Sequence, residues 1–216
     1  MSVRIALIHA TPLAIDPIVA AFAAAWPEAR LMNLLDDSLS ADLAEDGELT
    51  PAMVDRFHAL AAYGRGCGAD GILFTCSAFG RAIEAVREML PIPVLKPNEA
   101  MFEEALSAGS RLAMLATFAP SIPSMIAEFE EMSAGRTPSP ELSTHEVEGA
   151  LDAMKAGDPE RHDALIAETA SGLSDRDAVI LAQFSMARAA TRIPSGVRVL
   201  TSPDSAVRRM KQLLAA

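Results

Sequence analysis

Cys76 is the residue whose type and position first indicate chemistry in this chain. It follows Gly71 to Thr75, an apolar run typical of a strand buried on both faces, and the spacing from Phe79 onward is that of a helix. The N–H groups and dipole of a helix N-terminus favour a thiolate, so we expect the pKa of Cys76 to lie below about 8.5. The alternative is a small buried apolar residue, because free cysteines are among the most buried residue types.

A second copy of this stretch favours the chemical interpretation. A shift of 107 positions aligns residues 70–82 with residues 177–189 and places Arg4-Ile-Ala-Leu-Ile on Arg111-Leu-Ala-Met-Leu, while a shift of 106 places residues 91–97 on residues 197–203. A solenoid would repeat every ~20 to 50 residues, so this period indicates two similar halves instead. In the alignment, Gln183 is the counterpart of Cys76.

Strands and helices alternate in both halves, which predicts an α/β fold of parallel sheets with helices on both faces. Cap-plus-proline pairs mark helix starts at Asp16-Pro17, Thr50-Pro51 and Asp158-Pro159. The acidic stretch 36–47 shows no clear element. We place the first half at residues 1–97 plus 203–216 and the second at 98–202. The expected strands are 3–8, 29–35, 71–75, 92–95, 111–116, 142–147, 178–182 and 197–200.

Composition excludes several classes of function. The net charge is −11 and no run of five Lys or Arg occurs, which argues against nucleic acid and anionic membrane surfaces as partners. No stretch of about 18 apolar residues is present. The two cysteines, Cys67 and Cys76, predict neither a disulfide framework nor a zinc site, and no His, Cys and acidic cluster has metal-ligand spacing. We therefore expect no metal and a cytoplasmic protein; homo-oligomerisation stays open.

The predicted site lies at the carboxyl ends of the strands, where open parallel sheets bind ligands. Hydroxyls, an amide and helix N–H groups gather there, a donor set suited to a small carboxylate. The residues are Thr11, Thr75, Ser77, Thr117, Ser185, Gln183 and, in the turn after Gln183, Met186. The alternative for Thr11, Ser77 and Ser121 is a role as helix caps only. His9 ends a strand and is either a structural histidine or a proton-transfer group, whereas His58 and His162 have the pattern of ordinary helix residues.

The pattern resembles the aspartate/glutamate/hydantoin racemase superfamily, which also includes maleate isomerase and arylmalonate decarboxylase. The resemblance rests on Ile72-Leu-Phe-Thr-Cys-Ser-Ala-Phe-Gly80, on Val179-Ile-Leu-Ala-Gln-Phe-Ser-Met186 and on the duplicated strand starts. It implies two Rossmann-like halves with four-stranded sheets related by a pseudo-twofold axis, an active site in the cleft between them, and no cofactor. It also implies cysteine chemistry next to a substrate carboxylate, with one cysteine per half in the racemases.

The chain departs from this pattern at Gln183, where a racemase would carry its second cysteine. An amide cannot transfer the proton, so the sequence favours a one-thiol isomerase or decarboxylase that uses Cys76 as base, acid or nucleophile. One alternative is an amino-acid or hydantoin racemase with a different second acid, for which His9 is the nearest candidate. The other is a carboxylate-binding protein without catalysis.

Overall fold

The computed structural model describes residues 2–215, and the chain divides into two compact units. Unit 1 comprises Met1–Pro97 and Ala206–Ala216, and unit 2 comprises Asn98–Ser205. The division between the units falls after residue 97 and again after residue 205. Each unit is described by itself below.

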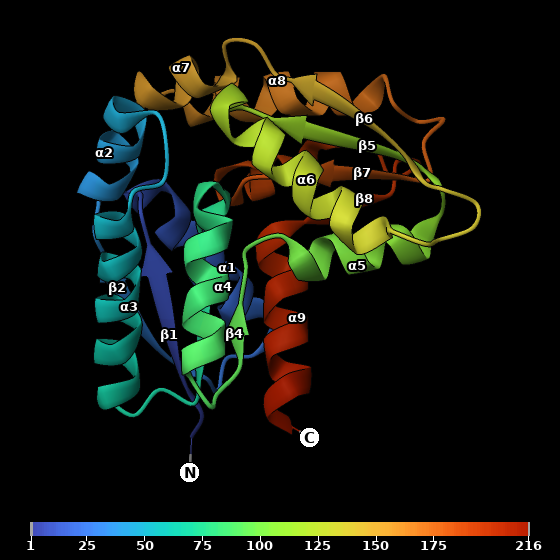
Figure 1. The fold of residues 1–216 in the computed structure, drawn as a ribbon. Coiled ribbons are helices and arrows are strands. Elements are labelled where there is room, and N and C mark those ends of the chain that lie inside the picture. The colour runs from blue at the N-terminus through green and yellow to red at the C-terminus, as the bar shows by residue number, and fades with distance from the viewer. Residues whose placement is uncertain (1, 216) are drawn as a thin grey trace. The chain divides into compact units, whose positions relative to one another are not determined.

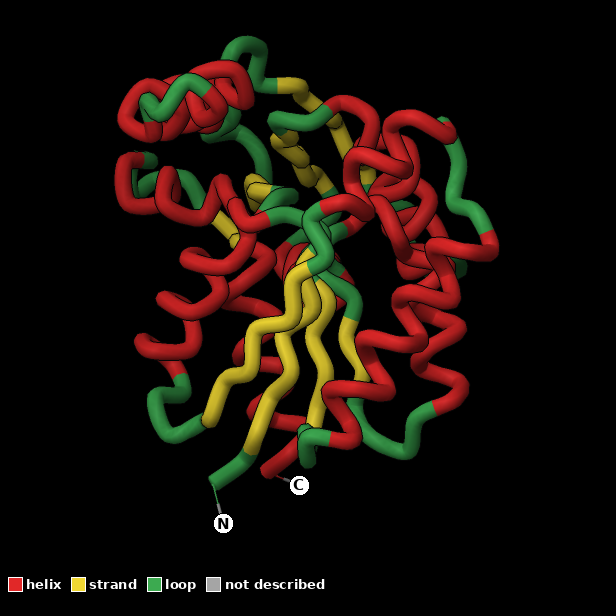
Figure 2. Tube along the Cα trace, turned by 90° about the vertical axis from the view of Figure 1, so that its left-hand side faces the viewer, coloured by secondary structure: helices red, strands yellow, loops and turns green. Residues whose placement is uncertain are grey.

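Unit 1 is a four-stranded parallel sheet with the strand order β2-β1-β3-β4. Figure 2 shows strands running side by side with helices flanking them. The strands are β1 (Arg4–His9), β2 (Arg30–Leu35), β3 (Gly71–Phe74) and β4 (Val94–Leu95). The helices are η1 (Pro12–Ala14), α1 (Ile15–Ala25), α2 (Ser38–Asp46), α3 (Pro51–Gly66), η2 (Ser77–Phe79), α4 (Gly80–Met89) and most of α9 (Ser202–Ala215), where η denotes a 3₁₀ helix.

Strand residues of unit 1 alternate between two packed faces, as a doubly covered sheet requires. Ala6 and Ile8 of β1 pack in one core cluster with residues of α3 and α4, the helices labelled beside β1 in Figure 1. At the start of β3, a Cβ on Gly71 would lie 2.7 Å from the sulfur of Met210 in α9. Glycine at this position therefore lets α9 pack closely on the sheet.

Unit 2 repeats the plan with the strand order β6-β5-β7-β8. Alternate residues of β5 again divide between two clusters: Leu112 and Met114 pack with α5 and α6, and Ala113 and Leu115 pack with α7, α8 and η4. Figure 1 shows α5 and α6 together, away from α7 and α8. The strands are β5 (Arg111–Ala116), β6 (Glu141–Glu146), β7 (Ala178–Leu181) and β8 (Val199–Thr201). The helices are α5 (Glu99–Ala108), η3 (Ala119–Ser121), α6 (Ile122–Ser133), α7 (Ala150–Lys155), α8 (Pro159–Ser171) and η4 (Phe184–Arg192).

The predicted α/β class with two four-stranded parallel sheets is confirmed, and several local predictions are corrected. The acidic stretch 36–47 is not a loop, because α2 occupies most of it. The first helical turn after β1 begins after Thr11, so Asp16 does not cap it as predicted. Thr50 and Asp158 do cap α3 and α8 through their side chains. No helix among the described residues is long and apolar enough to cross a membrane.

Candidate functional site

Cys76 lies two residues after β3 and is the residue before η2. Its side chain is partly buried, and burial raises the pKa of the thiol above its ordinary value. A hydrogen bond with the backbone N–H of Ala78 and one with the side chain of Ser40 lower this pKa but do not outweigh burial. The expectation of a lowered pKa is therefore wrong, because the short η2 turn supplies less stabilisation to the thiolate than burial removes.

Ser40 is a site residue that sequence reasoning missed, because it lies on α2, in the stretch without a predicted element. Its Oγ donates to the carbonyl oxygen of Ala10, at 2.7 Å, beyond the end of β1. Arg56 of α3 fixes the start of α2 through ion pairs with Asp36, at 2.6 Å, and with Asp42. This cation thus holds the segment that brings a hydroxyl to the thiol.

His9 is fully buried, and both of its ring nitrogens have partners. Nδ1 lies 2.8 Å from Oγ1 of Thr75, and Nε2 lies 3.0 Å from Oδ1 of Asn33. Burial lowers the pKa of His9, although the hydrogen bond with Asn33 acts in the opposite direction. A neutral ring satisfies both contacts if Nε2–H donates to Asn33 and the Thr75 hydroxyl, which also lies 3.3 Å from the carbonyl oxygen of Ile8, turns its proton to Nδ1. The geometry thus links His9 to the residue before Cys76.

Gln183 follows the carboxyl end of β7 and connects two loops of unit 2. Its Oε1 accepts from the backbone N–H of Thr117 at 2.8 Å and from the Thr117 hydroxyl at 3.4 Å. Its Nε2 donates to Oγ of Ser121 at 3.0 Å, and this oxygen donates to the carbonyl of Phe118 at 2.8 Å. The amide therefore braces the loop after β5 against the loop after β7, and it already uses the Thr117 N–H.

The remaining predicted site residues differ in the burial and hydrogen bonding of their side chains. The Thr11 side chain accepts from the N–H of Leu13 at 3.4 Å, which is the capping role weighed as its alternative. Ser77 and Ser185 are half-buried. The side chain of Met186 is fully buried in the core of unit 2, so it is not available to a ligand.

The structure brings some of the predicted residues together, in one group in each unit. In unit 1, Cys76 with Ser40 adjoins the pair formed by Thr75 and His9. In unit 2, Gln183 joins Thr117 and Ser121. Among residues 2–215, no three His, Cys, Asp or Glu side chains come together so that they could hold a metal ion.

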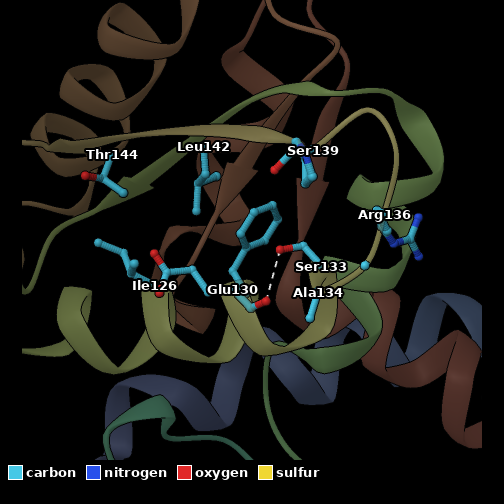
Figure 3. A pocket seen from close by; sticks show the side chains of 11 residues that line it. Ile126, Glu130, Ser133, Ala134, Arg136, Ser139, Leu142 and Thr144 are labelled. Atoms are coloured by element: carbon cyan, nitrogen blue, oxygen red, sulfur yellow. Dashed lines mark hydrogen bonds between the residues drawn. The ribbon is translucent and has the colours of Figure 1, made fainter.

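Two surface cavities of unit 2 lie away from these groups. A cavity of about 400 Å³ opens between the second half of α6 and the start of β6, over Phe129 and Leu142 (Figure 3). A neighbouring cavity of about 380 Å³ shares Arg136 and Pro140 with it. Neither is lined by a predicted site residue, and both lie near the amino end of β6, whereas ligands of parallel sheets bind at the carboxyl ends.

Comparison with known proteins agrees with this architecture over the whole chain. The model of the Asp/Glu/hydantoin racemase family matches residues 8–210. A search of curated proteins finds no match.

Solved structures share the fold at low sequence identity. An aspartate racemase homologue from Pyrococcus horikoshii is 16% identical with a TM-score of 0.76, and the match covers 100% of both chains. Allantoin racemase from Klebsiella pneumoniae is 22% identical with a TM-score of 0.64, covering 99% of this chain and 88% of that one. A glycine-to-cysteine variant of arylmalonate decarboxylase is 17% identical with a TM-score of 0.66, covering 99% of this chain and 94% of that one.

Proposed function

Because the chain belongs to the Asp/Glu/hydantoin racemase family, we propose that it is a cofactor-independent isomerase or lyase that acts on a small carboxylate with a single thiol, Cys76. The observation that carries this proposal is the difference between the two equivalent positions. Cys76 has hydrogen-bond donors on its sulfur, whereas Gln183 stands at the second position with its oxygen engaged by Thr117. One half therefore supplies a proton-transfer group and the other supplies an amide.

The raised pKa of Cys76 favours a thiol that carries its proton at rest. Such a group acts first as an acid, so the reaction begins without removal of a proton by Cys76. In a decarboxylation, the C–C bond to one carboxylate breaks, carbon dioxide leaves, and the electron pair stays on the α carbon as an enediolate. The S–H proton then moves to that carbon, and the thiolate regains a proton from water. Nucleophilic addition of the thiolate in an isomerase would first require this proton to leave.

Backbone N–H groups and hydroxyls at the carboxyl ends of the strands would hold the second carboxylate. In this proposal the unit 1 donors are the N–H groups after Cys76 with the hydroxyls of Thr11 and Ser77, and unit 2 contributes Ser185 and the amide of Gln183. Donors of this kind are worth about 10²–10³ in rate when they stabilise charge that develops during the reaction. The predicted cleft between the halves belongs to the same proposal.

The test uses small malonates, α-amino acids and hydantoins in deuterium oxide. We expect carbon dioxide release with one deuterium incorporated at the α carbon, or isomerisation, and we expect Cys76→Ser to abolish either. Cys67→Ser is the matched control, since Cys67 lies at the end of α3 and should leave the activity unchanged. Deuterium wash-in with inversion, in the absence of carbon dioxide release, would instead indicate racemisation with a second acid. Equal activity of wild type and Cys76→Ser would overturn the proposal.

A further inference from the structure

The segment that follows Gln183 is an element that needs support from outside. η4 runs for nine residues as a 3₁₀ helix, from Phe184 to Arg192. Runs of this helix longer than three or four residues are uncommon, because its hydrogen-bond geometry is poorer than that of the α-helix. Its first turn is closed by the N–H of Met186 on the carbonyl of Gln183, at 3.0 Å. The position of Gln183 is therefore tied to the position of η4.

Carboxylates of α8 hold η4 by two of its arginines. Nη2 of Arg188 lies 2.8 Å from Oδ2 of Asp163 and 3.4 Å from Oε1 of Glu160. Arg192 forms an ion pair with the other oxygen of Glu160. The Asp163 side chain is only 2% exposed and that of Arg188 is 49% exposed, so the inner contact joins a buried carboxylate to a cation at the surface.

The second oxygen of Asp163 is also engaged. Oδ1 lies 2.8 Å from Nδ1 of His162, whose side chain is 1% exposed. A buried carboxylate is costly unless it is paired and hydrogen-bonded. Movement of Arg188 away from Asp163 would therefore leave an uncompensated charge in the core. His162 is thus not the ordinary helix residue that its spacing predicts. The buried carboxylate fixes where Arg188, and with it η4, must lie.

In unit 1, the segment that follows Cys76 is held by different contacts from those that hold η4 in unit 2. There, the ring of Phe57 in α3 contacts the ring of Phe79, just after Cys76, with centroids 4.8 Å apart. The chain then continues as the regular α-helix α4. Apolar packing and a regular helix hold the segment after the thiol, whereas in η4 the buried side chains of Met186 and Ala189 are supplemented by the ion pair of Arg188 with the buried Asp163.

We infer that Asp163 is a positioning residue for the unit 2 half of the site. It acts through Arg188: the ion pair fixes η4, and η4 fixes Gln183 and the backbone N–H groups of Phe184 and Ser185 toward a substrate carboxylate. Asp163 itself does not touch the substrate. The inference rests on the proposed function for its consequence in catalysis, but its structural part can be tested without any substrate.

The structural test is amide hydrogen exchange followed by mass spectrometry. In Asp163→Asn we expect exchange over residues 184–192 to rise by about tenfold or more, with exchange in β7 unchanged, because local opening no longer has to break the buried ion pair. Glu160→Gln is the matched control, since it removes only the outer contacts, and its exchange should stay within about twofold of wild type. Unchanged exchange in Asp163→Asn, or an equal rise throughout unit 2, would overturn the inference.

A double variant keeps the test decisive if Asp163→Asn folds poorly. Asp163→Asn with Arg188→Gln removes the buried carboxylate and the guanidinium that it paired, so we expect it to fold with a melting temperature near wild type. It should nevertheless show the fast exchange in residues 184–192. Slow, wild-type-like exchange in this folded double variant would overturn the inference, because η4 would then hold its position without the ion pair.

The catalytic test compares kcat and KM. We expect Asp163→Asn and the double variant to raise KM and to lower kcat by up to about 10²-fold, the cost of a misplaced group. Arg188→Lys keeps the charge, so its kcat and KM should lie between those of the double variant and those of wild type. Glu160→Gln should stay near wild type in both. Equal activities across the series, with fast exchange confirmed, would overturn the catalytic part. A wild-type protein that turns over none of the substrates would refute the proposed function and leave the exchange result standing.

Discussion

The hydroxyl of Ser40 has one proton and two neighbours that can accept it. In the structure, this proton goes to the carbonyl of Ala10 at 2.7 Å. With Cys76 in the thiol form, S–H can therefore donate to the Ser40 oxygen, and both the thiol and the hydroxyl then have an acceptor. When the thiol ionises, the Ser40 hydroxyl must turn from the carbonyl to the sulfur. Ionisation thus leaves the Ala10 carbonyl without its Ser40 donor, and this cost adds to that of desolvating the thiolate.

Replacement of Ser40 tests this account at the level of a single residue. Ser40→Ala removes a donor to the thiolate, so we expect the pKa of Cys76 to rise further. The alkylation rate of Cys76 by iodoacetamide at pH 8 should fall by about threefold to tenfold, the equivalent of one hydrogen bond. The experiment uses a Cys67→Ser background so that one thiol is labelled.

Ser38→Ala is the control for this replacement, because Ser38 lies on the same helix but contacts Asp36 and Arg56. Its alkylation rate should match that of the parent protein. A faster rate in Ser40→Ala would mean that Ser40 only shields the sulfur from the reagent.

Gln183 makes a second prediction at the residue scale. Gln183→Ala leaves the backbone N–H of Thr117, a buried residue, without the acceptor that it has in the structure. Loss of one partner in a buried pair costs about 1–3 kcal/mol, so we expect the free energy of unfolding to fall by that amount in urea denaturation. Gln183→Glu keeps an oxygen for Thr117 and should lose less. Equal stability of Gln183→Ala and wild type would show that water replaces the amide.

At the scale of elements, the sequence predicted what local signals encode. Cap-plus-proline pairs located α3 and α8, and apolar runs located the strands of both sheets. It missed α2, because only Leu39 of that helix is buried and its start is held by Arg56, which is distant in sequence. Ser40 was missed with it. The extended 3₁₀ helix η4 escaped for the same reason, since the carboxylates that hold it come from α8.

In both halves an aspartate accepts a backbone hydrogen bond at the start of a neighbouring strand. Asp70 accepts from the backbone N–H of Arg4 at 2.8 Å. Its counterpart Asp177 accepts from the N–H groups of Ser110 and Arg111 at 2.9 Å, and from the Arg111 guanidinium at 3.0 Å. The backbone hydrogen bond from Arg111 and then its side chain lower the pKa of Asp177. Each contact ties the start of an inner strand to the start of its neighbour.

The stability that the Asp177 carboxylate contributes to the fold depends on pH in a defined direction. A carboxylate whose folded pKa lies below its unfolded value of about 3.9 stabilises the fold above that pH, and the stabilisation is lost as pH falls through the folded pKa. Asp177→Asn should therefore lower the melting temperature at pH 7, and the difference from wild type should shrink below about pH 4. Asp175→Asn is the control, because Asp175 is exposed and lies 3.7 Å from Arg176. A difference that persists unchanged at pH 3 would show that the charge of Asp177 does not matter.

At the scale of the whole molecule, the net charge opposes the approach of the carboxylate substrate that we propose. The chain carries a net charge of −11, and a carboxylate that approaches it is repelled over a distance set by ionic strength. Two cations of unit 1 are engaged with acids: Lys96, which follows β4, lies 2.9 Å from Glu84, and Arg56 of α3 binds Asp36. In the proposed function, recognition of a carboxylate therefore relies on neutral donors, which salt does not screen.

Two alkylating reagents of similar size separate these effects at Cys76. Iodoacetate carries the charge of a small carboxylate and iodoacetamide does not. Raising the ionic strength from about 10 mM to about 150 mM shortens the screening length from about 30 Å to about 8 Å. We expect the ratio of the iodoacetate rate to the iodoacetamide rate to rise by about twofold to tenfold over this range, because only the anion is relieved of the long-range repulsion. A ratio that falls with added salt would instead mean that a positive local field at Cys76 outweighs the net charge and draws carboxylates in.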